Sequence, residues 1–313
     1  KEFTGRVRVC GIGIPETIKE KHPAACGLLT RSMARLLPFP DPNMHKGGAG
    51  HVLVVGGSLG LTGAPLLAAL GALRCGCGLV TVACPGGLAR EVKAANPDVM
   101  TWPLGDKETW SELLADIIKE RLPQFAAVLI GPGLGRGPGA RRFLAALLAM
   151  QLPKTILDAD ALYWLAQDKS LFEKNGRDTV LTPHPGEMAL LAGKTIAEVQ
   201  ANRLVCAKMY AREKNVVLVL KGPGTVIAHP SGSEFLSPFT TPNLAVGGSG
   251  DVLAGILAGL TAQGLSPLDA ACLGVYWHGR AGEILKNEYP YRGNLASEIP
   301  HILPRALKEL RHV

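Results

Sequence analysis

Short apolar runs alternate with longer helical stretches along most of the chain. Each run is short, at most six residues, and ends in a polar or glycine-rich loop. This is typical of a buried parallel strand. Longer apolar stretches at residues 62–77 and 249–263 predict helices. This alternation indicates right-handed βαβ units and a largely parallel sheet. The predicted strands lie at residues 51–55, 79–83, 126–130, 155–157, 180–181 and 215–220.

Two segments depart from this alternation. Residues 221–235 read as strand, turn and strand, which predicts an antiparallel hairpin at the sheet edge. Before the α/β pattern begins, residues 7–14 predict a strand closed by Pro15. The prolines that follow resist helix formation, so residues 16–44 are interpreted as a linker and lead-in segment to a domain at 45–313.

Composition narrows the class of protein. The chain has 313 residues, of which 47% are hydrophobic, and this excludes a disordered chain. The net charge of +7 suits phosphorylated small molecules, whereas nucleic acid is not expected, because no basic run is interleaved with aromatic residues. The seven cysteines form no CxxC pair, which indicates reduced thiols in a cytoplasmic protein. No apolar run reaches the length of a membrane span.

The sharpest chemical motif is GGSGD at residues 247–251, at the start of the last long apolar helix. Gly247, Gly248 and Gly250 allow several backbone N–H groups to converge, and the helix start adds its positive dipole end. We expect an anion-binding site there. Asp251 is poorly suited to binding an anion, so it is interpreted as the base for a hydroxyl that attacks phosphorus. The alternative is a first-turn Asp that only favours the helix dipole.

This motif resembles the GxGD signature of ribokinase-like kinases. Further motifs, in the same order along residues 45–285, resemble the NAD(P)H-hydrate dehydratase family. Each is weak alone, and their combination is specific. They are HKGGAGHVLVVGGS at 45–58, TGA at 62–64, GPGLG at 131–135, LDADA at 157–161, TPHPGE at 182–187 and KGPGT at 221–225.

The resemblance implies a fold and a reaction. The fold would be a ribokinase-like three-layer α/β/α sandwich with a mostly parallel central sheet, an edge β-hairpin and no lid domain. The reaction would be ADP-dependent dehydration of hydrated NADH or NADPH, which returns the reduced cofactor and releases AMP and phosphate. ATP is the alternative donor, and Mg²⁺ would accompany the nucleotide. The resemblance also implies a homo-oligomer, specifically a tetramer.

The resemblance also implies residue roles. Asp251 would be the catalytic base and would contact the substrate. The other expected substrate-binding residues are Ala64, Gly133, Gly135 and His184. The expected nucleotide-binding residues are Lys221, Gly222, Pro223, Gly224, Thr225, Gly247, Gly248, Ser249 and Gly250.

Each of these residues also has a simpler interpretation. Pro223 and Gly224 suit a plain type II turn, and His184 suits a loop histidine bonded to backbone. Asp160 is expected to cap the following helix, while Asp158 is left open between magnesium and substrate. The metal ligands are not identified from the sequence. The glycine-rich segment at residues 131–137 does not support a dinucleotide fold, and residues 56–63 do not support a P-loop.

The first fifteen residues resemble the end of the epimerase domain that precedes the dehydratase in bifunctional members of the family. The chain begins with Lys1, so residues 1–15 are predicted to be a remnant of such a domain. Two other functions remain open. A small-molecule kinase of the thiazole or pyridoxal type would leave a stable phosphoester, and a nucleotide-binding sensor would leave its ligand intact.

Overall fold

The computed structural model describes residues 10–21, 24, 26–38, 41–172 and 178–311. Its centre is one sheet of ten strands in the order β1-β10-β9-β8-β7-β6-β5-β2-β3-β4. The neighbours from β8 through β4 pair in parallel, as the alternating pattern predicts. The strands are β1 (Gly27–Leu28), β2 (His51–Val55), β3 (Leu79–Pro85), β4 (Met100–Leu104), β5 (Ala127–Ile130), β6 (Lys154–Leu157), β7 (Thr179–Leu181), β8 (Val217–Leu220), β9 (Val226–Ala228) and β10 (Glu234–Leu236).

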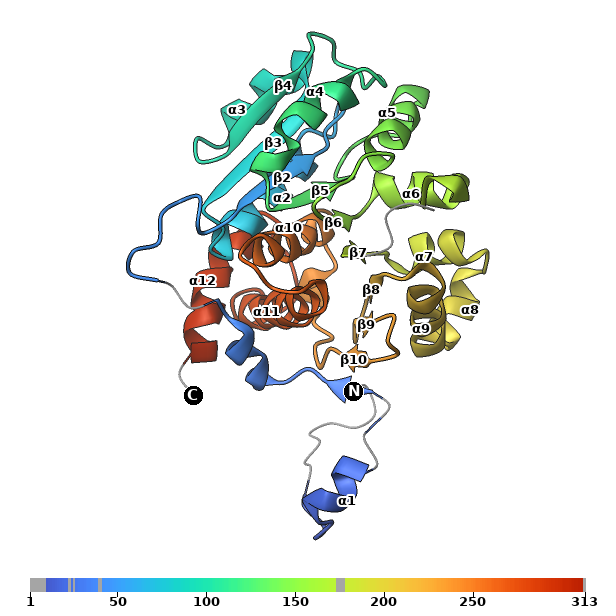
Figure 1. Cartoon of the computed structure of the whole chain (residues 1–313). Helices are drawn as coiled ribbons and strands as arrows, with labels where there is room; N and C mark the ends of the chain where they lie inside the picture. Colours follow the sequence, from blue (N-terminus) through green and yellow to red (C-terminus); the bar gives the residue numbers. More distant parts are fainter. Residues whose placement is uncertain (1–9, 22–23, 25, 39–40, 173–177, 312–313) are drawn as a thin grey trace.

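Helices cover both faces of the sheet, which confirms the three-layer α/β/α sandwich (Figure 1). On one face α2, α3, α10, α11 and α12 form a core with alternate strand residues, and α4, α5, α6, α7, α8 and α9 do so on the other. The helices are α2 (Gly63–Arg74), α3 (Ala89–Ala95), α4 (Leu114–Arg121), α5 (Pro138–Leu148), α6 (Asp160–Gln167), α7 (Pro185–Ala192), α8 (Ile196–Ala201), α9 (Arg203–Lys214), α10 (Ser249–Ala262), α11 (Pro267–Glu288) and α12 (Glu298–Arg311).

Helices α2 and α10 approach each other through glycines. A Cβ at Gly255 would lie 1.9 Å from the carbonyl oxygen of Ala68, and one at Gly71 would lie 2.4 Å from that of Val252. Both distances are far below van der Waals contact, so only glycine fits at either position. This contact fixes the start of α10 relative to the first turn of α2.

We expect Gly255→Ala to lower the free energy of unfolding by about 1–3 kcal/mol, because the new methyl group meets backbone that cannot move aside. The loss should exceed the helix-propensity gain of ~1 kcal/mol. Gly63→Ala is the matched control on α2, since no atom lies within 4 Å of the new Cβ. Denaturant titration measures both variants, and equal stability of the two would contradict the packing argument.

The predicted hairpin is confirmed as β9 and β10, which pair antiparallel from Glu234↔Ala228 to Leu236↔Val226. The lead-in segment contributes more than a linker. Strand β1 pairs in parallel with the outer side of β10, and Leu29 is completely buried. After it, a 3-10 helix at Arg31–Leu36 packs against the core.

The strand predicted at residues 7–14 is wrong where it can be examined. Residues 7–9 lie outside the described residues, and residues 10–14 have no regular structure. Ile12 is 82% exposed, so the apolar pattern that predicted a buried strand has no core to face in this chain. Helix α1 (Glu16–Lys21) follows and stands apart from the sheet (Figure 1). The domain boundaries at residues 15 and 44 stay predictions.

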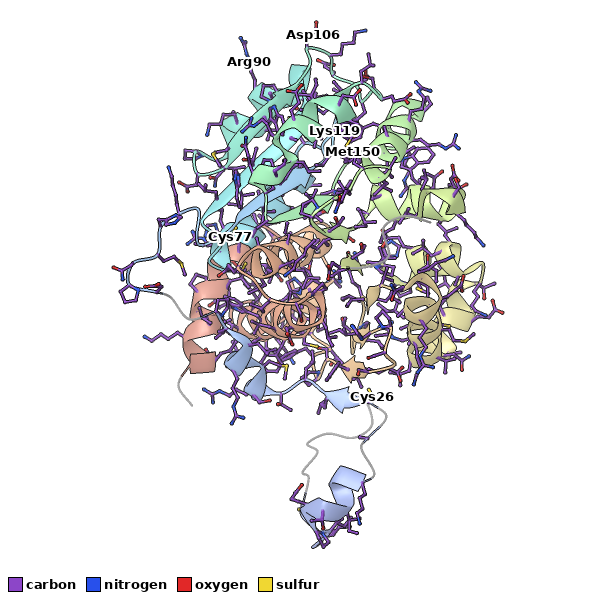
Figure 2. All side chains as sticks on the ribbon, viewed as in Figure 1. Cys26, Cys77, Arg90, Asp106, Lys119 and Met150 are labelled. Carbon is purple, nitrogen blue, oxygen red and sulfur yellow. The ribbon has the colours of Figure 1, made fainter. Side chains whose placement is uncertain are left out.

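The cysteines are free thiols dispersed through the fold. Figure 2 shows Cys26 and Cys77 at well-separated places on the molecule. Burial raises the pKa of the thiols of Cys77 and Cys84 to about 11, so both are protonated at neutral pH and unsuited to nucleophilic attack. Among the described helices, none is both long and apolar enough to cross a bilayer.

Candidate functional site

The loops that follow β5, β6, β7 and β8 meet at one edge of the sheet, where α10 begins. All four strands are parallel, so their carboxyl ends lie together, and ligands bind at such edges in open α/β sheets. The loop after β2 joins them, because Gly57 donates its N–H to Pro132 O at 3.0 Å. Every residue predicted from the sequence to bind substrate or nucleotide lies on these loops or at the starts of α2 and α10.

The start of α10 has the form expected of an anion-binding site. Gly248 is the residue before the helix and takes φ +93°, a conformation that side chains rarely adopt. A Cβ there would meet Leu67 on α2 at 2.5 Å, so the turn is pressed against that helix. Ser249 donates its N–H to Val246 O at 3.2 Å, whereas no backbone acceptor is present in the described residues for the N–H groups of Gly248 and Gly250 at this helix start.

A cation lies beside this turn. A Cβ at Gly250 would be 3.2 Å from Nζ of Lys221, which places the ammonium group directly over the helix start. The GGSGD turn and the lysine of the KGPGT loop, 26 residues apart in the sequence, therefore surround one point in space. An ammonium group and free amides together suit a phosphate.

Asp251 lies in the same first turn and is only partly exposed. Burial raises the pKa of its carboxyl group to about 7, and the negative charge of Asp158 adds to the rise, while Lys221 opposes it. A carboxylate whose pKa is near neutrality can accept a proton from a reacting hydroxyl, whereas an ordinary Asp is too weak a base. This environment differs from that of a solvated first-turn Asp.

Lys221 forms a buried ion pair. Its Nζ is 2.7 Å from Oδ1 of Asp158, whose side chain is 1% exposed, and 3.9 Å from Oε2 of Glu187. Burial alone would lower the pKa of the Lys221 ammonium, but the two carboxylates outweigh it and raise the pKa. Lys221 is therefore charged at the pH of the cell, and Asp158, left open from the sequence, is its partner.

His184 and Glu187 cap α7 reciprocally. Nδ1 of His184 accepts hydrogen bonds from Gly186 N at 3.0 Å and Glu187 N at 3.2 Å, and Oε2 of Glu187 accepts from His184 N at 2.7 Å. Because Nδ1 accepts, the imidazole is neutral and carries its proton on Nε2. Burial lowers the His184 pKa, and the charge of Lys221 lowers it further. The Nε2–H lies 3.5 Å from Oε1 of Glu187, on the exposed side of the ring.

The small residues predicted to contact substrate are close together. A Cβ at Gly133 would lie 3.3 Å from Cβ of Ala64, and one at Gly135 would lie 3.0 Å from Oγ of Ser58. Gly133 and Gly135 both take positive φ, +61° and +88°. Their loop therefore brings bare backbone next to the first turn of α2.

The expected helix cap at Asp160 is wrong. Asp160 is the first residue of α6, and the preceding Ala159 makes no side-chain cap. Oδ2 of Asp160 instead accepts from Gly135 N at 2.9 Å, and Oδ1 is 3.0 Å from Nε of Arg136. The carboxylate points back to the GPGLG loop because that loop crosses the α6 start, so it braces the loop rather than the helix.

The KGPGT loop turns through two glycines with positive φ, Gly222 at +137° and Gly224 at +62°. Gly224 has the conformation required at the third position of a type II turn, so the simple turn reading holds locally. Thr225 Oγ1 donates to Gly222 O at 3.0 Å, so its hydroxyl proton is already used in a hydrogen bond within the loop. Only its oxygen lone pairs remain for a ligand.

Sequence reasoning missed several residues at this site. Glu187 follows His184 by three positions, the spacing of a capping box, so its bond to the His184 backbone could have been predicted. No motif or spacing in the sequence marks Arg136 or His278 as a residue of the site. Oγ of Ser249 and Nε2 of the buried His278 are 3.3 Å apart, and burial lowers the His278 pKa to about 4. A neutral histidine on α11 thus holds the hydroxyl of the anion-binding turn.

The site suits a metal ion carried by a ligand rather than one held by protein alone. Among the residues that the structure describes, no group of three or more His, Cys, Asp or Glu is arranged to hold a metal. The buried Asp158 carboxylate is already paired with Lys221. Mg²⁺ commonly uses one or two carboxylates, waters and nucleotide phosphates, so a nucleotide phosphate bound at the start of α10 would bring most of its ligands.

The chain resembles known proteins in both sequence and fold. A family model described as NAD(P)H-hydrate dehydratase matches residues 52–305. The bifunctional NAD(P)H-hydrate repair enzyme Nnr of Moorella thermoacetica is 43% identical over 98% of this chain, which spans 59% of that enzyme. An ADP/ATP-dependent NAD(P)H-hydrate dehydratase from Bacillus subtilis, co-crystallised with ATP and Mg²⁺, superposes with a TM-score of 0.75 at 31% identity, covering 91% of this chain and 99% of that one. A ribokinase-like superfamily protein from Enterococcus faecalis gives 0.78 at 26% identity, covering 91% and 96%.

Proposed function

Because the chain belongs to the NAD(P)H-hydrate dehydratase family and has a ribokinase-like fold, we propose that it uses ADP to dehydrate hydrated NADH or NADPH. The observation that carries the proposal is the juxtaposition at the start of α10. There the free N–H groups of Gly248 and Gly250, the Lys221 ammonium and the Asp251 carboxylate lie at the same helix start. An anion site with a base beside it is what transfer of a phosphoryl group to a hydroxyl requires.

The reaction balances as two steps. Asp251 takes the proton of the ring hydroxyl, whose oxygen attacks the terminal phosphorus of ADP, and the bond from phosphorus to the AMP oxygen breaks. The new phosphate ester then leaves the ring as inorganic phosphate with its bonding electrons. The ring nitrogen supplies the compensating electron pair, and the adjacent carbon loses a proton to water. The products are AMP, phosphate and the reduced nicotinamide.

The remaining residues bind and orient. We propose that Lys221, Gly222, Pro223, Gly224 and Thr225, with residues 247–250, hold the nucleotide. Ala64, Gly133, Gly135 and the Nε2–H of His184 would contact the hydrated cofactor. Mg²⁺, held chiefly by the phosphates beside Asp251, would neutralise charge during transfer.

The decisive experiment mixes the protein with hydrated NADH or NADPH, Mg²⁺ and ADP or ATP. Recovery of the reduced-nicotinamide absorbance together with stoichiometric phosphate is the expected result. A stable phosphoester without recovery would indicate a small-molecule kinase instead. Nucleotide binding with an unchanged substrate would indicate a sensor.

The reaction should depend on pH through Asp251. Its carboxyl group must be ionised to act as a base, so kcat/KM should rise with pH along a limb with an apparent pKa near 7. Burial raises the pKa of Glu187 to about 7 as well. Glu187→Gln separates the two, because its amide oxygen still accepts from the His184 backbone. Persistence of the limb in this variant assigns it to Asp251, and disappearance would reassign it.

Assembly and context are further parts of the proposal. The curated relative from Moorella thermoacetica is bifunctional, and this chain spans 59% of it. That supports a preceding epimerase domain of which residues 1–15 are the end. We expect a cytoplasmic homotetramer, which light scattering of the purified protein would measure.

A further inference from the structure

Arg203 is the first residue of α9, and its guanidinium hydrogen-bonds to the KGPGT loop. Its Nη2 donates to the carbonyl oxygens of Leu220 at 3.1 Å, Lys221 at 3.3 Å and Gly224 at 3.4 Å. Nη1 donates to Oε1 of Gln200 at 3.0 Å. Among the described residues no carboxylate pairs with this guanidinium, so its charge is directed at backbone carbonyls.

The guanidinium also fits the loop sterically. A Cβ at Gly222 would lie 2.8 Å from Nη1, so the loop is drawn down against the arginine at the position where it has no side chain. Arg203 is partly buried, and this burial lowers the pKa of its guanidinium. A buried charge persists only where it is well bonded, and here the loop carbonyls supply those bonds.

Holding these carbonyls fixes where the next amides point. The described peptide bonds are all trans, so the N–H that follows a carbonyl points the opposite way. The N–H after Leu220 O belongs to Lys221 and donates to Pro183 O at 2.8 Å. The N–H of Gly222 follows Lys221 O, and the N–H of Thr225 follows Gly224 O. Neither N–H donates to a backbone oxygen among the described residues. They face away from Arg203.

We infer that Arg203 is a positioning residue for the nucleotide: by fixing the carbonyls of Lys221 and Gly224, it aims the N–H groups of Gly222 and Thr225 at the anionic or ribose oxygens of ADP. The inference rests on the proposed function for the identity of the ligand. Lysine is not an equivalent replacement, because an ammonium lacks the second nitrogen that bonds Oε1 of Gln200 and holds Nη2 in a fixed plane.

The test uses Arg203→Lys and Arg203→Met, with Arg212→Lys and Arg212→Met as controls. Arg212 is on the same helix and lies beside Gly232 in the hairpin turn, not beside the KGPGT loop. Calorimetry gives the Kd for ADP, and steady-state kinetics give KM for each substrate. We expect the Kd and KM for ADP to rise roughly tenfold in Arg203→Lys and further in Arg203→Met. The KM for the hydrate and kcat at saturating ADP should stay within about threefold, and the Arg212 variants should match the wild type.

Two outcomes would overturn the inference. An unchanged Kd for ADP, even with a lowered Tm, would make Arg203 purely structural. An equal rise in KM for both substrates would mean general loss of order. Wild-type protein that binds ADP but does not restore reduced nicotinamide would refute the dehydratase proposal and leave the Kd comparison intact. Wild-type protein that does not bind ADP would refute both.

Discussion

Asp251→Asn should lower kcat by about 10²–10⁴-fold, the usual contribution of a positioned general base. The ADP Kd should stay within about tenfold, because backbone amides and Lys221 bind the phosphate and the amide side chain keeps the shape of the turn. Turnover assays and calorimetry measure the two effects. Asp269→Asn is the matched control, since Asp269 lies in the first turn of α11. A large loss of ADP affinity in Asp251→Asn would argue against a base role.

The same variant should be more stable than the wild type at pH 8. The folded protein holds the Asp251 proton up to about pH 7, whereas the unfolded chain loses it near its ordinary pKa of ~3.9. Between these values the folded state binds more protons, so stability falls as pH rises. The neutral Asn removes this cost. We expect a gain of about 1–3 kcal/mol at pH 8 that vanishes below about pH 4, as measured by unfolding at both pH values.

Lys221→Met should have the largest effect on stability. It leaves the Asp158 carboxylate, 1% exposed, without its partner at 2.7 Å. Breaking a buried pair from one side costs about 3–5 kcal/mol. The control is the pair of Lys208 with Glu234, which is 2.8 Å long and has a lysine side chain that is 31% exposed and a glutamate side chain that is 7% exposed. Water reaches this pair more easily, so Lys208→Met should cost clearly less.

A double variant separates stability from binding. Lys221→Met with Asp158→Asn removes both charges and should recover most of the lost stability. ADP binding should not return, because the ammonium beside Gly250 is still missing. Recovery of both properties would mean that Lys221 acts only through the ion pair. Recovery of neither would place the defect elsewhere in the loop.

Six of the parallel strands and the motifs at their ends could be predicted from the sequence because both depend on local pattern. The run at 51–55 with its following glycines, and GGSGD before an apolar helix, each carry their meaning within about ten residues. Strand β4 gave no such pattern, since its Pro103 and partly exposed side chains lack the apolar run of a buried strand. It is found only through its pairing with β3.

The contacts that assemble the site could not be predicted in this way. Lys221 meets Asp158 across 63 positions, and Arg203 reaches the KGPGT loop from a helix start with no special sequence. Asp160 is a residue for which the local sequence pattern predicted the wrong role. Its place before a helix favoured a cap. The GPGLG loop crosses that helix start, however, and Gly135 N donates a hydrogen bond to the Asp160 carboxylate instead. Tertiary neighbours decided these roles.

The short strand β1 limits how far the chain can be truncated from its N-terminal side. Leu29 donates its N–H to Leu236 O at 2.9 Å and is fully buried. A chain shortened to residue 45, the start suggested by the sequence motifs, would open the outer edge of β10 and leave a hole where Leu29 had been. Unpaired sheet edges invite self-association. Any truncation intended to isolate the catalytic unit should therefore keep residues 26–37.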